Sequence, residues 1–125
     1  MDALRAALAG FETPGGAALR VSSPASLPRL PAAVEVAAYR IVVEAATNAV
    51  RHAAARTIRC ELEVVGGEFR VTVRDDGRGI GADAPAGVGL TSMRERAEEL
   101  GGTCTVRRLG GGGTSVRAAL PIGAQ

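Results

Sequence analysis

The residues best suited to chemistry lie where a run of alternating hydrophobic and polar residues meets a cluster of glycines, at Asp75-Asp76-Gly77-Arg78-Gly79. An ionised carboxylate only accepts hydrogen bonds, so a carboxylate here suits a ligand group that donates them, such as an exocyclic amine. Because glycine lacks a Cβ, Gly77 and Gly79 allow positive φ angles and let a flat or anionic ligand approach the backbone. The stretch therefore predicts a ligand-binding turn.

A second group of polar residues recurs upstream at helical spacing: Glu44, Asn48, Arg51 and His52. When each residue turns a helix by about 100°, these four fall within an arc of about 100°. We expect the opposite side to be crowded by small apolar residues, namely Val42, Ala45, Ala46, Ala49 and Ala53. A solvated helix face explains such a pattern. Carboxylate and amide oxygens also suit Mg²⁺, which keeps several waters and takes few protein ligands, so the face is compatible with a metal–phosphate group.

A third candidate stretch is Gly87-Val88-Gly89-Leu90, which leads into a helix. A glycine turn at a helix N-terminus presents free N–H groups to an anion. Ser92 and Glu95 fit a capping box that starts this helix. Its expected apolar stripe consists of Leu90, Met93, Ala97 and Leu100.

Hydrophobic periodicity predicts the elements that must position these residues. Helices are expected over residues 2–11 and from Pro31 to about Ala54, and strands over residues 18–22, 57–65, 69–73, 103–109 and 114–120. Gly66-Gly67 lies between two alternating runs and indicates a tight hairpin. Each strand has one hydrophobic and one polar face, which is typical of antiparallel sheets.

Composition limits the classes of protein that this chain can belong to. Its 125 residues, 46% hydrophobic and 22% charged, suffice for one globular core, so we expect a single domain over residues 1–125. The net charge is +2, acids and bases alternate along the strands, and only 2% of residues are aromatic, which disfavours nucleic acid as a partner. No apolar run approaches the roughly 18 residues of a membrane span. Cys60 and Cys104 lack paired spacing and are expected to be buried, reduced thiols.

Two common nucleotide-binding motifs do not explain the glycines. Residues 77–82 satisfy the dinucleotide fingerprint in letters, but Pro85 and more glycine follow where a parallel unit requires a helix. The chain also lacks the Gly-Lys-Ser/Thr phosphate loop. A nucleotide would therefore have to be bound by a different motif.

Four short motifs, in order, resemble those of one superfamily. The stretch Glu44-Ala45-Ala46-Thr47-Asn48 resembles the N box, Asp75 to Gly79 the Asp-x-Gly-x-Gly box, Gly87 to Leu90 the second glycine box, and Gly113-Thr114 the closing Gly-Thr. Together they are similar to the GHKL superfamily of gyrase, heat-shock chaperone, histidine kinase and MutL-type ATPases. Residues 39–53 and 87–96 are most similar to bacterial sensor histidine kinases that partner NarL-type response regulators.

This resemblance implies a fold and a set of sites. The fold would be α+β, a two-layer α/β sandwich with a mostly antiparallel mixed sheet covered on one face by helices. Asp75 would accept from the adenine amino group, supported by Thr114 directly or through water; Asn48 would bind Mg²⁺, and Glu44 would activate or orient the nucleophile. The other implied ATP-binding residues are Arg51, His52, Gly77, Gly79, Ile80, Gly87, Val88, Gly89 and Leu90. Residues 82–86, between the boxes, are few, which implies a short ATP lid.

The resemblance also implies a function and partners. The family's acceptor histidine lies on a preceding dimerising helical hairpin, whereas the only histidine here is His52. We therefore expect a monomeric catalytic domain that uses ATP and Mg²⁺ and phosphorylates its own separate dimerisation domain, with a NarL-type response regulator downstream. Its expected location is the cytoplasm, with membrane anchoring of the parent kinase left open. Two alternatives stay open: a stand-alone serine kinase related to anti-sigma factors, and a nucleotide-binding interaction module without phosphotransfer.

Overall fold

The computed structural model describes residues 3–24, 27–77, 90–109 and 112–123. In chain order the elements are helix α1 (Ala3–Ala9), a short 3-10 helix η1 (Pro14–Gly16), strand β1 (Ala18–Ser22), helix α2 (Ala32–Ala53), strands β2 (Thr57–Val65) and β3 (Glu68–Asp75), helix α3 (Leu90–Glu99), and strands β4 (Thr103–Arg108) and β5 (Thr114–Pro121). The predicted elements are therefore present, with ends that match or differ by at most three residues.

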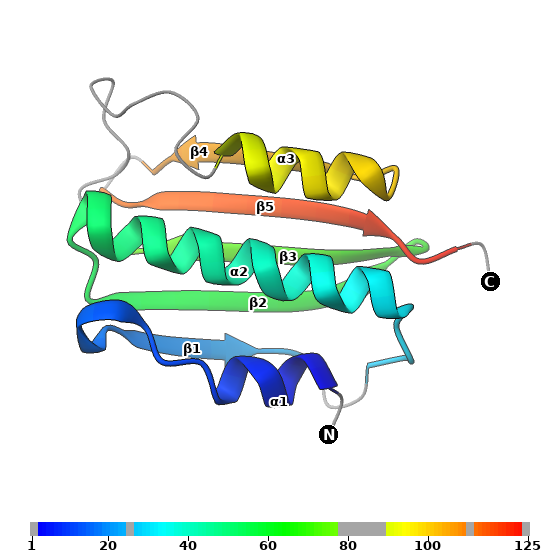
Figure 1. The fold of residues 1–125 in the computed structure, drawn as a ribbon, viewed down its shortest axis with the longest axis horizontal. Coiled ribbons are helices and arrows are strands. Elements are labelled where there is room, and N and C mark those ends of the chain that lie inside the picture. Colours follow the sequence, from blue (N-terminus) through cyan, green and yellow to red (C-terminus); the bar gives the residue numbers. More distant parts are fainter. Residues whose placement is uncertain (1–2, 25–26, 78–89, 110–111, 124–125) are drawn as a thin grey trace.

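The strands form one five-stranded sheet in the order β1-β2-β3-β5-β4 (Figure 1). β1 pairs with β2 in parallel, and the other neighbours are antiparallel. The β2–β3 hairpin turns at Gly66 and Gly67, whose φ angles are 58° and 79°, and it closes on the Val65–Glu68 pair. Positive φ at both central residues matches the twist of the flanking strands, which is why two glycines suit this turn.

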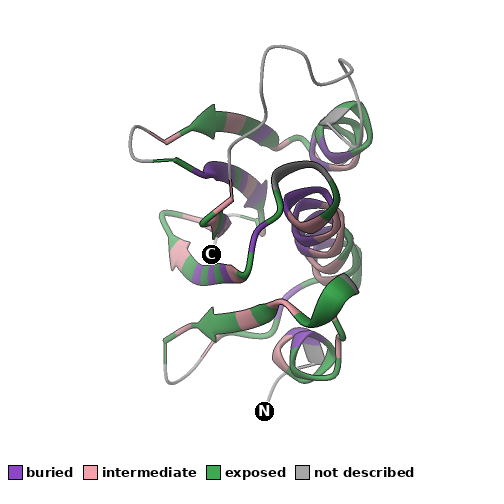
Figure 2. Cartoon of the chain, turned by 90° about the vertical axis from the view of Figure 1, so that its left-hand side faces the viewer, coloured by how far each residue is buried: buried purple, intermediate pink, exposed green. Residues whose placement is uncertain are grey.

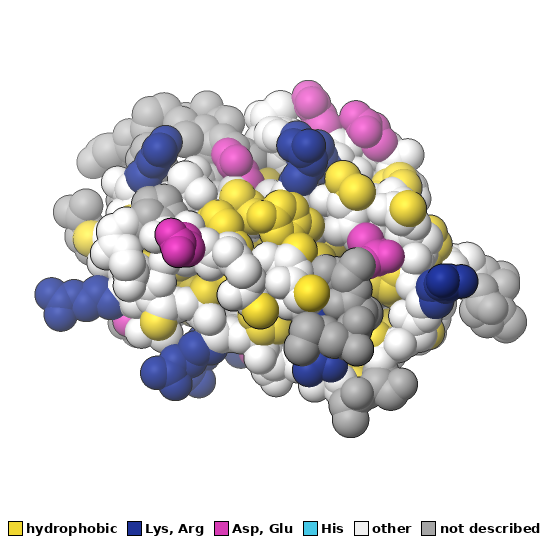
Figure 3. Space-filling view, turned by 60° about the horizontal axis from the view of Figure 1, so that its bottom comes forward, with side chains coloured by type: hydrophobic (Ala, Val, Ile, Leu, Met, Phe, Trp, Pro, Cys, Tyr) yellow, Lys and Arg dark blue, Asp and Glu magenta, His cyan; other side chains and the backbone are white. Residues whose placement is uncertain are grey.

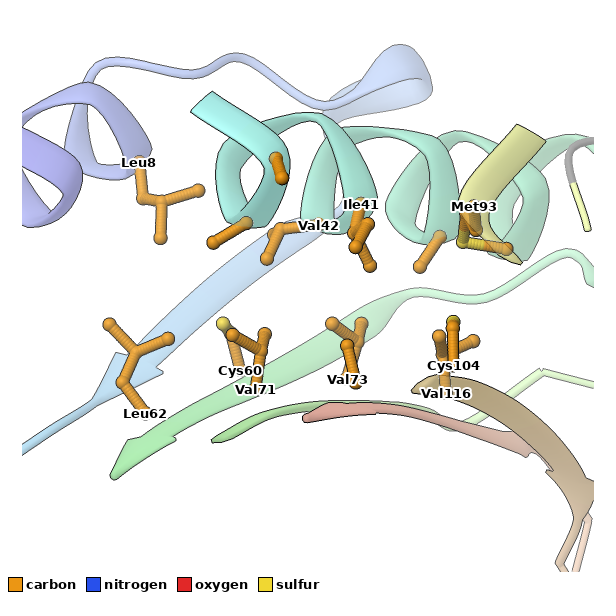
Figure 4. Packing of buried hydrophobic residues seen from close by; sticks show 14 of the residues in the cluster. Leu8, Ile41, Val42, Cys60, Leu62, Val71, Val73, Met93, Cys104 and Val116 are labelled. Atoms are coloured by element: carbon orange, nitrogen blue, oxygen red, sulfur yellow. The ribbon is translucent and has the colours of Figure 1, made fainter. Parts of the chain in front are cut away.

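The helices cover one face of this sheet and leave the other face bare among the described elements (Figure 2). Hydrophobic side chains fill the space between the layers: Ile41 and Val42 of α2 and Met93 of α3 point toward Val71, Val73 and Val116 of the sheet (Figure 4). Burying a side chain of this size stabilises the fold by roughly 1.5–3 kcal/mol. The expected two-layer α+β sandwich with a mixed sheet is confirmed.

Both cysteines are buried and free, as expected. They lie within this layer, Cys60 on β2 and Cys104 on β4. Burial, together with the neighbouring Glu61 carboxylate, raises the pKa of the Cys60 thiol to about 12. Because the thiolate is the reactive form, Cys60 is a packing residue.

The prediction that Asn48 lies on the side of α2 opposite the alanines is wrong. Asn48 is only 6% exposed and lies beside Ala45 and Ala49, whereas Arg51 is exposed. The first half of the helix explains the difference, since Val34 and Ile41 are buried as well. They extend the core-facing stripe toward Asn48, so a long helix lying flat on a sheet buries more of its circumference than the alanines alone indicate.

The capping box predicted at Ser92 is also wrong. Helix α3 begins at Leu90, so Ser92 already lies within the first helical turn, where it is exposed. A capping residue requires non-helical backbone angles, and Ser92 cannot have them inside the helix. The apolar stripe is confirmed for Met93 and Ala97, both buried, and for Leu100, which packs partly buried against the core.

The packing of α2 on the sheet gives a stability test. Ile41 is fully buried, so Ile41→Ala should lower the free energy of unfolding by about 2–5 kcal/mol through lost burial and a residual cavity. Val36→Ala on the same helix is the matched control, because Val36 is 54% exposed and its truncation should change stability by no more than about 0.5 kcal/mol. Urea denaturation measures both; equal losses would contradict the described orientation of α2.

Candidate functional site

Three polar residues from distant parts of the chain meet at one small cavity. Asn48 comes from the C-terminal half of α2, Asp75 ends β3, and Thr114 begins β5. The cavity has a volume of about 10 Å³, room for about one water molecule. Apolar side chains complete its lining: Ala45, Ala49, Met93 and Val116. The fold thus brings together an amide, a carboxylate and a threonine in a largely buried setting.

The pairing of β3 with β5 places Asp75 against Thr114. Their antiparallel register pairs Arg74 with Ser115, so the next residues along, Asp75 and Thr114, are also neighbours. The chain enters β5 through Gly113, which has a φ of 94°. A Cβ at this position would lie 2.1 Å from the Asp75 carbonyl oxygen. Only glycine fits this close backbone approach, which is the physical reason for the Gly-Thr pair.

The Asp75 carboxyl is half-buried, and its pKa is raised from the ordinary value of 3.8, chiefly because burial removes water from the charged form. Hydrogen bonds from the backbone of Gly77 and Thr114 act in the opposite direction, and the neighbouring Asp76 charge raises the pKa further. The Gly77 N–H donates to Asp75 Oδ1 over 2.8 Å. A carboxylate has about four acceptor positions, so capacity is left for a ligand donor.

The adjacent carboxylate, Asp76, has a different environment. It is exposed, and its Oδ1 accepts hydrogen bonds from the backbone N–H groups of Arg56 and Thr57 at 2.8 and 3.0 Å. These bonds lower the pKa of Asp76. Asp76 therefore ties the end of β3 to the start of β2, and Asp75 is the carboxylate at the cavity.

Glu44 and Asn48 lie one turn apart on α2 but line different hollows. Glu44 is half-buried and borders a hollow of about 530 Å³ on the outer side of the helices, together with Tyr39 and Val43 of α2, Leu4 of α1 and other residues. Figure 3 views this side of the molecule and shows hydrophobic side chains gathered near its centre, with acidic and basic side chains around them. The small cavity at Asp75 does not include Glu44 among its lining residues.

Several expected site residues lie outside the described residues, namely Gly79, Ile80, Gly87, Val88 and Gly89. For His52 and Leu90 only the helical backbone is described. Within the described part of the chain, no three His, Cys, Asp or Glu residues are grouped closely enough to hold a metal ion.

Met93 was expected only as part of a hydrophobic stripe, yet it lines the Asp75 cavity. Nothing local in the sequence indicates this, because α3 reaches the cavity through packing between layers. Gly113 carried a usable signal in the Gly-Thr pair, but its contact with Asp75 depends on strand pairing. None of the helices in the described ranges is both long and apolar enough to span a membrane.

Comparisons with known proteins agree with this architecture. Residues 33–124 match the family described as histidine kinase-, DNA gyrase B- and HSP90-like ATPases. Among curated proteins, the chain is 37% identical over 91 residues to the sensor histidine kinase LiaS of Bacillus subtilis, covering 71% of this chain and 25% of LiaS. It is 44% identical over 90 residues to the nitrate/nitrite sensor protein NarQ of Escherichia coli, covering 70% of this chain and 16% of NarQ. The chain thus spans a quarter or less of the length of these two relatives.

Solved structures show the same fold. The histidine kinase domain of the Erythrobacter litoralis EL346 blue-light activated kinase superposes with a TM-score of 0.67 at 32% identity, covering 86% of this chain and 52% of that chain. Full-length ShkA superposes with a TM-score of 0.76 at 24% identity, covering 98% of this chain and 30% of that chain, a likeness of fold alone. Since the family match spans well over half of its length, this chain belongs to the histidine kinase-, DNA gyrase B- and HSP90-like ATPase family.

Proposed function

We propose that this domain binds ATP with Mg²⁺ in a site bordered by Asn48, Asp75 and Thr114 and transfers the γ-phosphate to a histidine on a separate dimerisation domain. The observation that carries the proposal is the convergence of these three side chains, from α2, β3 and β5, on one largely buried cavity. The solved structure of ShkA, which has the same fold, is a complex with AMPPNP. A protein of this fold that is solved with AMPPNP supports the assignment of a nucleotide site to this domain.

Asp75 is the proposed adenine-reading group. Its half-buried carboxylate already accepts the Gly77 N–H and keeps capacity for the exocyclic amino group of adenine. The cavity beside it has room for about one water, so Thr114 supports the base directly or through that water. Gly77, Gly79 and Ile80 would border the adenine.

Asn48 is the proposed metal ligand. Mg²⁺ commonly takes only one or two protein oxygens and completes its shell with waters and substrate phosphates, so a site with one amide oxygen fits it. When bound, Mg²⁺ neutralises charge on the β- and γ-phosphates. Asn48 is buried and lines the same cavity as Asp75, so the two side chains would contact different parts of one bound nucleotide. Arg51 and His52, further along α2, would line the phosphate side.

The remaining site residues have proposed roles toward the phosphates and the nucleophile. The stretch from Gly87 to Leu90 would form the phosphate end of the lid. Glu44 would orient or activate the incoming imidazole. In the transfer, the acceptor nitrogen forms a bond to the γ-phosphorus, the bond to the β–γ bridging oxygen breaks, and ADP leaves with those electrons.

The proposed partners are the protein's own dimerisation and acceptor domain and, downstream, a NarL-type response regulator. LiaS and NarQ, a sensor histidine kinase and a nitrate/nitrite sensor protein, support the assignment of this domain to a sensor kinase. The proposed location of this domain is the cytoplasm, where ATP is available.

The function is tested by phosphotransfer. The chain alone should bind ATP but acquire no acid-labile label from γ-labelled ATP, because His52 is fixed within α2 and cannot easily reach an in-line position. Adding a helical acceptor domain at high concentration should give a labelled acceptor. Label on the isolated chain that disappears in His52→Ala would overturn the requirement for a partner, and ATP binding without transfer to any acceptor would favour an interaction module.

Asp75→Asn separates binding from folding. Hydrogen bonds to charged groups contribute about 1.5–3 kcal/mol, so ATP affinity should fall by about tenfold to a hundredfold. Stability should not fall at pH 7. The raised pKa means that the folded state binds the Asp75 proton more tightly than the unfolded state, so the wild type loses stability as pH rises from 3.8 through the raised pKa. The Asp75→Asn variant has no carboxyl group at this position, so it does not lose this stability as the pH rises.

Titration calorimetry measures the ATP affinity of Asp75→Asn, and thermal unfolding between acid and neutral pH measures its stability. Unchanged ATP affinity would remove Asp75 from the site. A variant less stable than the wild type at pH 7 would show that Asp75 has a structural role like that of Asp76.

Asn48 and Glu44 should differ in kinetic signature. Asn48→Ala should reduce the dependence of ATP affinity on Mg²⁺, because it removes a metal ligand. Glu44→Gln keeps the size of the side chain and should spare ATP affinity while lowering the rate of transfer to an added acceptor. ATP titrations with and without Mg²⁺, followed by transfer assays, measure both. Equal losses of affinity in the two variants would show that this division of roles is wrong.

A further inference from the structure

The sheet face opposite the helices carries a row of arginines. The strand register pairs Arg20 with Arg59 and Arg59 with Arg74, and it pairs both Arg74 and Arg107 with Ser115. These residues therefore form one line across all five strands. Their neighbours along the strands, such as Cys60 and Val73, are buried toward the helices, so the arginines point to the bare face seen in Figure 2.

This row brings like charges together. Neighbouring strands lie about 4.8 Å apart, so Arg20, Arg59 and Arg74 stand directly side by side. Like charges placed directly opposite on a sheet are destabilising. Among the described residues, Arg74 is paired with Glu61 at 3.3 Å, and no ion pair forms at Arg20 or Arg59. The fold tolerates an unbalanced positive charge here, which an anionic partner would relieve.

The same face is hollowed beside the row. A hollow of about 520 Å³ lies over β3, β5 and β4 and is lined by Arg74, Arg107 and Arg117, with the hydroxyl residues Thr105 and Ser115 between them. Arg107 and Arg117 are exposed and have no ion pair with another described residue. Guanidinium groups bind carboxylates through two parallel hydrogen bonds, and hydroxyls add donors, so the hollow matches acidic side chains.

The other end of the face limits the kind of partner. Toward the β2–β3 hairpin, Glu63 and Glu68 lie on this same face, and Glu68 pairs with Arg70 at 3.2 Å. A uniformly anionic surface as broad as a bilayer would be pressed against these carboxylates. The face also has no aromatic side chain on which bases stack, since Phe69 is buried and the other aromatics, Phe11 and Tyr39, lie outside the sheet.

We propose that the arginine face, defined as Arg20, Arg59, Arg74, Arg107 and Arg117, is a docking surface for an acidic polypeptide segment of a partner protein. A narrow acidic segment covers the arginine end of the strands and avoids the carboxylates at the other end. Side chains alternate between faces along a strand, so Arg74 lies on the face opposite to that of Asp75. A partner docked here leaves the Asp75 cavity uncovered, and docking does not depend on the nucleotide site.

The test uses the whole chain with a fluorescent ten-residue glutamate peptide as probe, in fluorescence anisotropy at low salt. Arg107→Glu combined with Arg117→Glu should weaken peptide binding by about tenfold or more, since two attractive contacts become repulsive. Arg29→Glu combined with Arg40→Glu is the matched control, because it makes the same change of charge at two exposed arginines outside the sheet. This control variant should keep most of its affinity for the peptide. Thermal unfolding checks that each variant is folded. If the double glutamate variant is unfolded, Arg107→Gln with Arg117→Gln replaces it.

Binding that is lost in the sheet variant, kept in the control variant and weakened between about 0.05 and 0.5 M salt supports the proposal. Absence of peptide binding to the wild type, or equal weakening in both variants, overturns it. Duplex DNA and phosphatidylglycerol vesicles are run in parallel. If either binds more tightly than the peptide and loses affinity in the same sheet variant, the surface serves that partner, and the assignment to an acidic polypeptide is wrong.

Discussion

The antiparallel pairing of β3 with β5 is the constraint on which both proposed functional surfaces of this domain depend. On the helix side, it sets Asp75 beside Thr114 and requires glycine at position 113, where a Cβ would collide with the Asp75 carbonyl oxygen. On the bare side, the same register aligns Arg74 with Ser115 and, through β4, with Arg107. A shift of one residue would exchange the two faces of a strand, so the carboxylate and the arginines keep their separate positions only in this register.

Helix α2 completes the cavity because it lies flat on the sheet. Ile41 and Val42 are fully buried against the strands, and this packing carries Asn48, two turns further along, to the ends of β3 and β5. An amide buried in such a layer is costly unless it has a hydrogen-bond partner, and among the described residues no fully buried side-chain nitrogen or oxygen lacks one. The site is therefore assembled by the same hydrophobic layer that stabilises the fold.

The adjacent carboxylates Asp75 and Asp76 differ in pKa and in role because their environments differ. Asp76 is exposed and accepts two backbone N–H groups, which lower its pKa, so its charge stabilises the fold. Asp75 is half-buried, and desolvation raises its pKa, so its charge opposes folding at neutral pH. A charged group that destabilises the empty protein is typical of a binding site, because the bound ligand supplies the hydrogen bonds that the group lost when it was removed from water.

The sequence by itself determined the order of the elements, the glycine hairpin at Gly66-Gly67 and the family, because turn chemistry, periodicity and the four short motifs are local patterns. It also singled out Asp75 and Asn48 by residue type and spacing, and Thr114 through a resemblance alone. Tertiary structure alone decided that Asn48 faces the core instead of solvent, that Met93 lines the cavity, that Asp76 is structural, and that arginines from four strands form one row. These features depend on register and on packing between layers, which join residues far apart in the chain, and no local pattern records such pairings.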